Sequence, residues 1–219
     1  MSKRPLPAAD FCQLASANLH RGNLAFGYAY GERGETLQVK RFGRPFAPEL
    51  VVWAEATLAL GHVRAPTAGQ TDTEGHIHPL ASERFYLAHN GLLLNHEAFG
   101  EWRLGDGWDL DSHVILGGIT KGVAEGQAVV AAIEGVVGQL NGQQSCWLWD
   151  REEGAVYLWR VMSPLYWGAA EGAVMWASVA TERTPTRAKQ GVVYRVDVGE
   201  VMVEEVGGFS FYCPYQVRD

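Results

Sequence analysis

Polar residues that packing does not require follow apolar stretches at three places in the sequence. The first stretch ends at Arg64, the second contains His89, Asn90 and Gly91, and the third ends where Asp111 begins a helical pattern. The planar guanidinium of an arginine binds a carboxylate through two parallel hydrogen bonds. A side-chain amide next to a backbone N–H can stabilise a developing oxyanion. Together these residue types suit a site for a small charged substrate.

Each of these features also has a simpler explanation. Alone, Arg64 could be a surface arginine in an ion pair, and an Asn-Gly pair between apolar runs is most often a hairpin turn. Asp111 followed by Ser112 is a good helix N-cap. The histidines allow a metal-dependent hydrolase, because imidazole is a common zinc ligand. The candidate ligands for such a metal are His62, Asp72, His76, His78, His89 and His113.

The order and spacing of the three segments resemble the glutaminase domain of class II glutamine amidotransferases. In that family the first segment reads Gly-His-x-Arg with a downstream Thr, the second reads His-Asn-Gly-x-x-x-Asn, and an acidic residue opens a helix in the third. Further matches are His20-Arg21-Gly22, His78-Pro79-Leu80, Ser163-Pro164-Leu165 and Trp176-Ala177-Ser178. The match covers residues 19–178. Together the segments are far more specific than any one of them alone.

The resemblance implies a fold and a reaction. The fold would be α+β, a four-layer αββα sandwich of the N-terminal nucleophile hydrolases, with residues 1–219 as one class II glutamine amidotransferase-like domain. The reaction would be hydrolysis of L-glutamine to glutamate and ammonia, with no cofactor and no metal. No synthase domain follows in the sequence, so we expect a separate synthase or ligase subunit to bind the ammonia acceptor.

The resemblance also implies roles for individual residues. Arg64 would hold the α-carboxylate of glutamine, and Asp111 would hold its α-ammonium group. The side-chain amide of Asn90 and the backbone N–H of Gly91 would form the oxyanion hole. Weaker candidates for lining the glutamine pocket are Arg21, Gly22, Thr67 and His78.

The nucleophile of the family has no counterpart at the start of this sequence. It is an N-terminal cysteine whose own α-amino group acts as general base, a role that suits an amine with a pKa near neutrality. Ser2 is a poor substitute because Lys3-Arg4-Pro5 is not an apolar strand sequence. Cys12 lies inside a predicted helix, where we expect a small hydrophobic residue.

We therefore expect a short cysteine-bearing strand to precede Met1, and the chain as written to lack glutaminase activity. The alternative is a catalytically inactive domain that binds glutamine or a partner protein.

Helices and two sets of strands must position these residues. Apolar spacing predicts a first helix over residues 8–19. Three helices are predicted in the middle of the chain, over residues 95–102, 111–120 and 124–137. Strands are predicted on both sides of them, over residues 24–30, 36–40, 57–63, 85–89, 146–149, 156–161, 165–168, 174–178, 192–198 and 201–206. The first two strands form a hairpin, and the whole order indicates an α+β layered domain.

Composition narrows the class of partner. The net charge is -7 and the basic residues are scattered, so no electrostatic footprint for nucleic acid or an anionic membrane is present. Cys12, Cys146 and Cys213 show no metal-ligand spacing, and an odd number of cysteines favours a reducing cytoplasm. No apolar run approaches the roughly 20 residues that span a bilayer, and residues 1–7 lack the apolar segment of a signal peptide. We expect a cytoplasmic protein with a small-molecule substrate.

Overall fold

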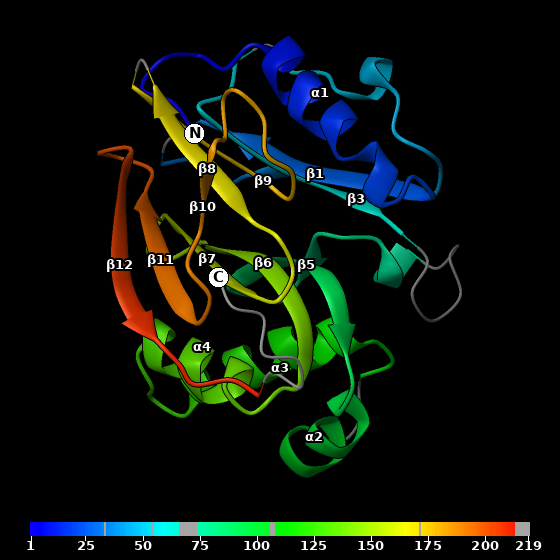
Figure 1. Cartoon of the computed structure of the whole chain (residues 1–219), viewed down its shortest axis with the longest axis vertical. Coiled ribbons are helices and arrows are strands. Elements are labelled where there is room, and N and C mark those ends of the chain that lie inside the picture. Colours follow the sequence, from blue (N-terminus) through cyan, green and yellow to red (C-terminus); the bar gives the residue numbers. More distant parts are fainter. Residues whose placement is uncertain (33, 54, 66–73, 106–107, 171, 213–219) are drawn as a thin grey trace.

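A six-stranded antiparallel sheet forms the middle of the molecule (Figure 1). The computed structural model describes residues 1–32, 34–53, 55–65, 74–105, 108–170 and 172–212. The strand order of the sheet is β12-β11-β7-β6-β5-β4. Its strands are β4 (Leu80–Ala81), β5 (Phe85–Leu93), β6 (Gly142–Asp150), β7 (Ala155–Val161), β11 (Val192–Asp197) and β12 (Met202–Gly208).

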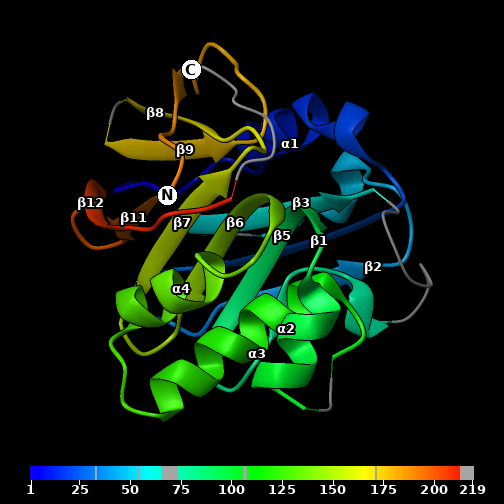
Figure 2. The same ribbon diagram turned by 60° about the horizontal axis from the view of Figure 1, so that its bottom comes forward.

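Two three-stranded sheets lie on one side of this sheet (Figures 1 and 2). The order of one is β2-β1-β3 and the order of the other is β10-β8-β9. Their strands are β1 (Ala25–Gly31), β2 (Gln38–Phe42), β3 (Leu58–Arg64), β8 (Tyr166–Ala170), β9 (Ala173–Ala177) and β10 (Thr186–Arg187). Side chains from both small sheets share an apolar core with the six-stranded sheet, including Leu60, Trp149 and Leu158.

Three α-helices cover the opposite face of the six-stranded sheet (Figure 2). They are α2 (His96–Arg103), α3 (Asp111–Ala124) and α4 (Val129–Val137). The buried residues of α3 recur at helical spacing, as Ile115 and Ile119 do, so one face of the helix is apolar and packs on the strands. The side chain of Val136 would lie 2.9 Å from a Cβ at Gly118, so this glycine lets α3 and α4 approach closely.

The remaining helix, α1 (Ala8–Ala17), packs on the sheet that contains β1 and β3. Phe11 of α1 contacts Phe26, Tyr28 and Trp53, with ring centroids 5.4 to 6.4 Å apart. A Cβ at Gly61 would lie 2.5 Å from the Phe11 ring, so the helix sits directly on β3. Short 3-10 helices span Leu19–Arg21, Pro48–Leu50 and Glu74–His76.

The structure confirms the mixed α+β class and the predicted helices and strands, with corrections at particular residues. β5 continues through Asn90 and Gly91, so the hairpin-turn explanation of this pair is wrong. The third middle helix begins at Val129 and not at residue 124. The short strands β4 and β10 were not predicted. No helix in the described part of the chain is long and apolar enough to cross a membrane.

Candidate active site

A small cavity collects residues from β3, β5 and the start of α3. Its volume is about 40 Å³, and its walls include Arg64, His78, Asn90, Gly91 and Asp111. Arg64 is the last residue of β3, and Asp111 is the first residue of α3. Residues that are far apart in the sequence therefore bring a cation, an anion and amide donors to one place.

The backbone of β5 requires glycine at position 91. Gly91 has φ of 156°, and a Cβ there would lie 1.8 Å from the carbonyl oxygen of Gln143 on β6. Asn90 lies opposite Ser145 in the same pairing. The side-chain amide of Asn90 donates to the hydroxyl of Ser178 at 3.4 Å. The pairing of β5 with β6 thus fixes the positions of Asn90 and Gly91, the two residues that we predict to form the oxyanion hole.

The carboxylate of Asp111 is held from several sides. It accepts the backbone N–H of Leu93 at 3.2 Å and the hydroxyl of Ser112 at 3.2 Å, and Nδ1 of His89 lies 3.8 Å away. Burial acts to raise the pKa of Asp111, but His89, Leu93 and Ser112 together outweigh it and lower that pKa to about 2. Asp111 is therefore ionised at neutral pH.

Asp111 does not cap its own helix, which corrects the N-cap alternative. The N-cap position of α3 is Leu110, and no side chain there makes a capping hydrogen bond. The carboxylate reaches back to β5 through Leu93 instead.

Arg64 and two histidines complete the electrostatics of the small cavity. Arg64 is only 5% exposed, and burial lowers its pKa while the charge of Asp111 acts to raise it. Burial, His89 and Arg64 lower the pKa of His62 to about 3. Burial also lowers the pKa of His78 well below its usual range, with neighbouring histidines adding to the effect. Both imidazoles are therefore neutral, and a fixed cation and anion remain beside them.

The histidines do not form a metal site within the described residues, where no group of three His, Cys, Asp or Glu side chains could hold a metal ion. His62 and His78 lie with ring centroids 4.4 Å apart. His76 and His113 instead contact Asp109, at 2.6 and 2.5 Å. Asp72, another candidate ligand, lies outside the described residues.

The other predicted pocket residues lie elsewhere. Arg21 lines a separate, larger cavity. A Cβ at Gly22 would lie 2.4 Å from the backbone nitrogen of Ala65, so Gly22 lets the chain pass close behind the end of β3. Thr67 lies outside the described residues.

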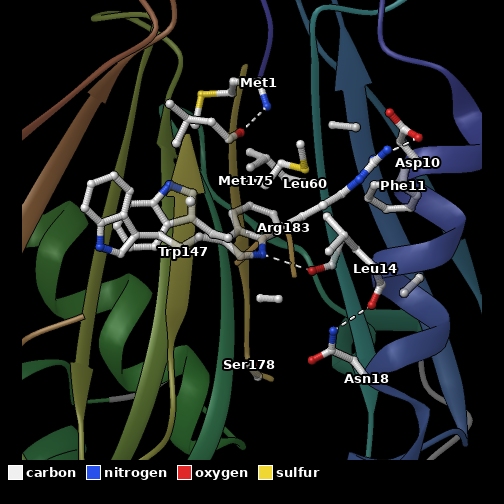
Figure 3. A pocket seen from close by; sticks show the side chains of 18 of the residues that line it. Met1, Asp10, Phe11, Leu14, Asn18, Leu60, Trp147, Met175, Ser178 and Arg183 are labelled. Carbon is white, nitrogen blue, oxygen red and sulfur yellow. Dashed lines mark hydrogen bonds and ion pairs between the residues drawn. The ribbon is translucent and has the colours of Figure 1, made fainter. Parts of the chain in front are cut away.

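The larger cavity has a volume of about 820 Å³ and lies between β3, β9, α1 and the six-stranded sheet (Figure 3). Apolar side chains such as Phe11, Leu60 and Trp147 make most of its walls. Asn90 and His62 line both cavities, so the two spaces adjoin at β5 and β3.

Neither described cysteine is placed as an activated thiol. Cys12 is half-buried and packs against the core beneath α1, and burial raises its pKa. Cys146 belongs to the core beneath α3 and α4, and burial and the charge of Asp111 raise its pKa well above the usual range. The amine of Met1 donates to the carbonyl of Val174 at 2.9 Å, and burial lowers its pKa to about 5. Cys213 lies outside the described residues.

Sequence reasoning missed two hydroxyl groups of the site. Ser112 donates to Asp111 and lies 3.0 Å from Nδ1 of His89, and Ser178 accepts from Asn90. Both stand inside the matching segments of the sequence, but only the fold shows which polar groups they touch.

Comparison with known proteins gives one consistent result. No family model matches the chain. Glutamine–fructose-6-phosphate aminotransferase of Geobacillus kaustophilus is 29% identical over 182 residues, which are 81% of this chain and 29% of that protein. The same enzyme of Halalkalibacterium halodurans is 30% identical over 131 residues, covering 58% of this chain and 22% of that protein. The chain thus spans less than a third of the length of these curated relatives.

Solved structures agree at the level of the fold. Glutamine phosphoribosylpyrophosphate amidotransferase of B. subtilis superposes with a TM-score of 0.70 and 17% identity, covering 92% of this chain and 47% of that one. A glutamine aminotransferase class-II domain protein of Silicibacter pomeroyi gives a TM-score of 0.58 and 18% identity, covering 84% of this chain and 91% of that one. The chain is therefore homologous to the glutaminase domains of class II glutamine amidotransferases, and it shares their fold.

Proposed function

We propose that the small cavity binds L-glutamine and that the domain hydrolyses the side-chain amide when an N-terminal nucleophile is supplied beside Asn90. The observation that carries this proposal is that Arg64, Asp111 and the Asn90-Gly91 pair line one cavity. Free glutamine presents an anion, a cation and an amide, and these residues supply a complement for each of the three.

Binding follows from charge and geometry. The guanidinium of Arg64 takes the α-carboxylate as a bidentate pair. The Asp111 carboxylate accepts hydrogen bonds from the Leu93 N–H and the Ser112 hydroxyl. A carboxylate can accept about four hydrogen bonds, so Asp111 can also accept those of the α-ammonium group. The side chain of glutamine then points past Asn90, where the two cavities adjoin.

The chemistry is amide hydrolysis through a thioester. A thiol adds to the amide carbon, and the oxygen of the tetrahedral intermediate accepts hydrogen bonds from the Asn90 amide and the Gly91 backbone N–H. Collapse breaks the C–N bond and releases ammonia, with the thiol proton passing to the leaving nitrogen. Water then cleaves the thioester, which gives glutamate and restores the thiol.

The wider architecture is proposed on the same basis. The four layers would be α1, the two three-stranded sheets, the six-stranded sheet and the helices α2 to α4, in one domain over residues 1–219. Ammonia would pass to an acceptor held by a separate synthase or ligase subunit. No residue role in this mechanism calls for a cofactor.

The proposal is tested by glutamine binding to the chain itself. We expect isothermal titration to detect binding, and Arg64→Ala to weaken it by roughly 30-fold or more, because a buried charge pair loses one partner. Arg151→Ala is the control, since this arginine donates to the Glu83 carbonyl away from both cavities. Equal affinity in the two variants would overturn the assignment. Ammonia release by the chain as written, abolished by Ser2→Ala or Cys12→Ala, would contradict the expected lack of turnover.

A second candidate is glutamine binding without turnover. It is favoured by the two described thiols, Cys12 and Cys146, which pack in apolar cores with raised pKa values. Supplying an N-terminal cysteine separates the two candidates. A glutaminase gains ammonia release, and a binding domain does not.

A further inference from the structure

The carboxylate of Asp109 lies between two histidines and joins two segments of the chain. Oδ2 of Asp109 is 2.6 Å from Nε2 of His76, and Oδ1 is 2.5 Å from Nδ1 of His113. Nε2 of His113 lies 3.2 Å from the carbonyl oxygen of Gly75. These contacts link the 3-10 helix Glu74–His76 to the start of α3.

Both linked segments carry walls of the small cavity. His78 stands two residues after the 3-10 helix, and residues 110–112 directly follow Asp109. All four of these residues line the small cavity. A shift of one segment away from the other would therefore move two of its walls apart.

The two ends of the segment over residues 75–79 are held differently. At its far end, Arg41 of β2 donates two hydrogen bonds to the carbonyl of Pro79, at 2.8 and 2.6 Å. At its near end, the contacts include those with Asp109 and His113. Arginine stays charged at all pH values of interest, whereas histidine titrates in the physiological range. Only the near end can therefore respond to pH.

The surroundings of His113 favour a charged imidazole ring. A neutral imidazole has one N–H and one lone pair, whereas the protonated ring has two N–H groups. One nitrogen of His113 faces the Asp109 carboxylate, and the other faces the Gly75 carbonyl. The hydrogen bond from His76 lowers the pKa of Asp109, so this carboxylate is ionised. Only the protonated His113 ring can donate to both oxygens, and a neutral ring turns a lone pair toward one of them.

The other titratable groups beside these residues, among the described side chains, do not change charge between pH 5.5 and pH 8. His78 is neutral, because burial lowers its pKa well below the usual range and neighbouring charges, His113 among them, add to the effect. Asp111 is ionised, with a pKa of about 2, and accepts the N–H of Leu93. A pH dependence in this window therefore belongs to the histidines around Asp109.

We propose that His113 and Asp109 are positioning residues of the small cavity, and that with His76 they form a clamp that closes when His113 is protonated. As the pH falls, the clamp holds residues 75–78 against the start of α3 and fixes His78 in the cavity wall. As the pH rises, His113 loses a proton, one of its two contacts becomes repulsive, and the near end of the segment loosens. The clamp itself does not depend on glutamine.

The exposure of Asp109 limits the size of the effect. Its side chain is 63% exposed, whereas those of His76 and His113 are 11% and 23% exposed. Water and salt screen charge contacts at such an exposed carboxylate. We therefore expect changes of about threefold and not of several orders of magnitude.

The consequence for a ligand rests on the proposed function. If the small cavity binds glutamine, loosening the wall that carries His78 lowers the affinity. We expect glutamine to bind about threefold more tightly at pH 5.5 than at pH 8. Asp111 stays ionised over this range, so its charge does not explain such a difference.

The first test measures hydrogen exchange of the backbone amides of residues 75–78 at pH 5.5 and pH 8, with each rate corrected for its intrinsic pH dependence. Protection should be about threefold greater at pH 5.5. His113→Gln keeps a donor for the Gly75 carbonyl but carries no charge, so it should remove this difference. His20→Gln is the control and should keep it, because His20 is exposed and lines neither cavity. Protection that is independent of pH in the parent chain, or a difference that persists in His113→Gln, would overturn the proposal.

The second test needs no variant and observes the His113 ring directly. Long-range ¹H–¹⁵N NMR of the histidine side chains distinguishes a ring with two N–H groups from a ring with one. We expect two N–H groups on His113 at pH 5.5 and one at pH 8. A ring with a single N–H at pH 5.5 would overturn the clamp, even if His113→Gln fails to fold.

Isothermal titration with glutamine at the same two pH values tests the link to the cavity. We expect the threefold ratio of affinities in the parent chain and in His20→Gln, and its loss in His113→Gln. Equal affinities at both pH values in a parent chain whose clamp responds to pH would overturn the positioning role. If glutamine binds at neither pH, the proposed function fails, and amide exchange and NMR still decide whether the clamp exists.

Discussion

The two adjoining cavities share Asn90 and His62 but are built in opposite ways. The smaller one is lined by charged and hydrogen-bonded groups, with Asp111 held by Leu93 and Ser112. The larger one has mostly apolar walls, formed by side chains such as Phe11, Leu60 and Trp147. The smaller cavity is held in shape by hydrogen bonds and charges, whereas the larger one is shaped mainly by apolar packing.

The contrast separates recognition from reaction. In the proposed function, the cation of Arg64 and the anion of Asp111 bind a zwitterionic ligand without any change of protonation near neutral pH. The proposed reaction would need a nucleophile beside Asn90, where the two cavities adjoin. Disrupting each side in turn tests whether this division is real.

The largest effect is expected at the boundary itself. In a version that carries an N-terminal cysteine strand and is active, Asn90→Ala should lower kcat by about two to three orders of magnitude, the usual result of deleting one oxyanion donor. Arg64→Ala should act mainly on KM, because the carboxylate is bound alike in the ground and transition states. Steady-state ammonia release measures both.

The control for Asn90 is Asn95→Ala. Asn95 donates to the Gln139 carbonyl and accepts from the Asn141 backbone, outside both cavities. It should lower stability but leave kcat unchanged. A kcat for Asn90→Ala within a factor of two of the parent enzyme would remove the oxyanion assignment.

The next largest effect is expected on stability, where a glycine of the small cavity is compared with a glycine at the surface. Gly91→Ala should lower the free energy of unfolding by about 3 kcal/mol or more, because its Cβ would lie 1.8 Å from the Gln143 carbonyl. Gly34→Ala is the matched control: its φ is also positive, at 81°, but nothing lies within 4 Å. It should cost about 1 kcal/mol. Similar urea midpoints for the two variants would show that β5 tolerates rearrangement at the site.

The sequence predicted the polar cavity better than the apolar one, and the reason is physical. Arg64, Asn90 and Asp111 belong to local patterns in which a polar residue follows an apolar strand or opens a helix. Such patterns can be recognised in the sequence because the strand and the polar residue are neighbours in the chain. Hydrophobic periodicity located most helices and strands for the same reason.

The larger cavity depends on contacts between distant segments. Ser2 and Lys3 are held by backbone hydrogen bonds to Thr57 and Gly172, which no local pattern encodes. The two-residue strand β10 is likewise defined by its pairing with β8. Asp109, placed between His76 and His113, is a third case, since the histidines were first considered as metal ligands.

A smaller effect is expected from pH. His62 has a folded-state pKa of about 3, against about 6.5 when unfolded, because burial, His89 and Arg64 disfavour its cation. The unfolded state therefore binds more protons, and stability is lost as pH falls below 6.5. Between pH 7 and pH 5 the loss should reach about 2 kcal/mol per such histidine. Asp111, with a pKa of about 2, stays ionised over this window and does not contribute.

The variant His62→Gln should flatten this dependence, as measured by urea unfolding at pH 7, 6 and 5. His20→Gln is the control, because His20 is exposed and lines neither cavity. His78 remains in both variants, so part of the pH dependence of the free energy of unfolding persists. An unchanged slope in His62→Gln would mean that its ring is solvated, and the small cavity would lose its description as a buried site.

The smallest effect is expected at the wall of the larger cavity. Arg183, in the segment after β9, contacts Asp10 of α1 at 2.9 Å, and both residues line that cavity (Figure 3). The side chains are 44% and 31% exposed, so water and salt screen the pair. A double-mutant cycle of Asp10→Asn and Arg183→Gln should therefore give a coupling below about 1 kcal/mol. Asp150 is different, because it is fully buried against Arg84, and Asp150→Asn should cost about 3 kcal/mol. The segment that carries Arg183 is therefore held on α1 only weakly, so this wall of the larger cavity can move at little cost. A coupling well above 1 kcal/mol that resists salt would mean that the wall is rigid, and the contrast with the smaller cavity would fail at this point.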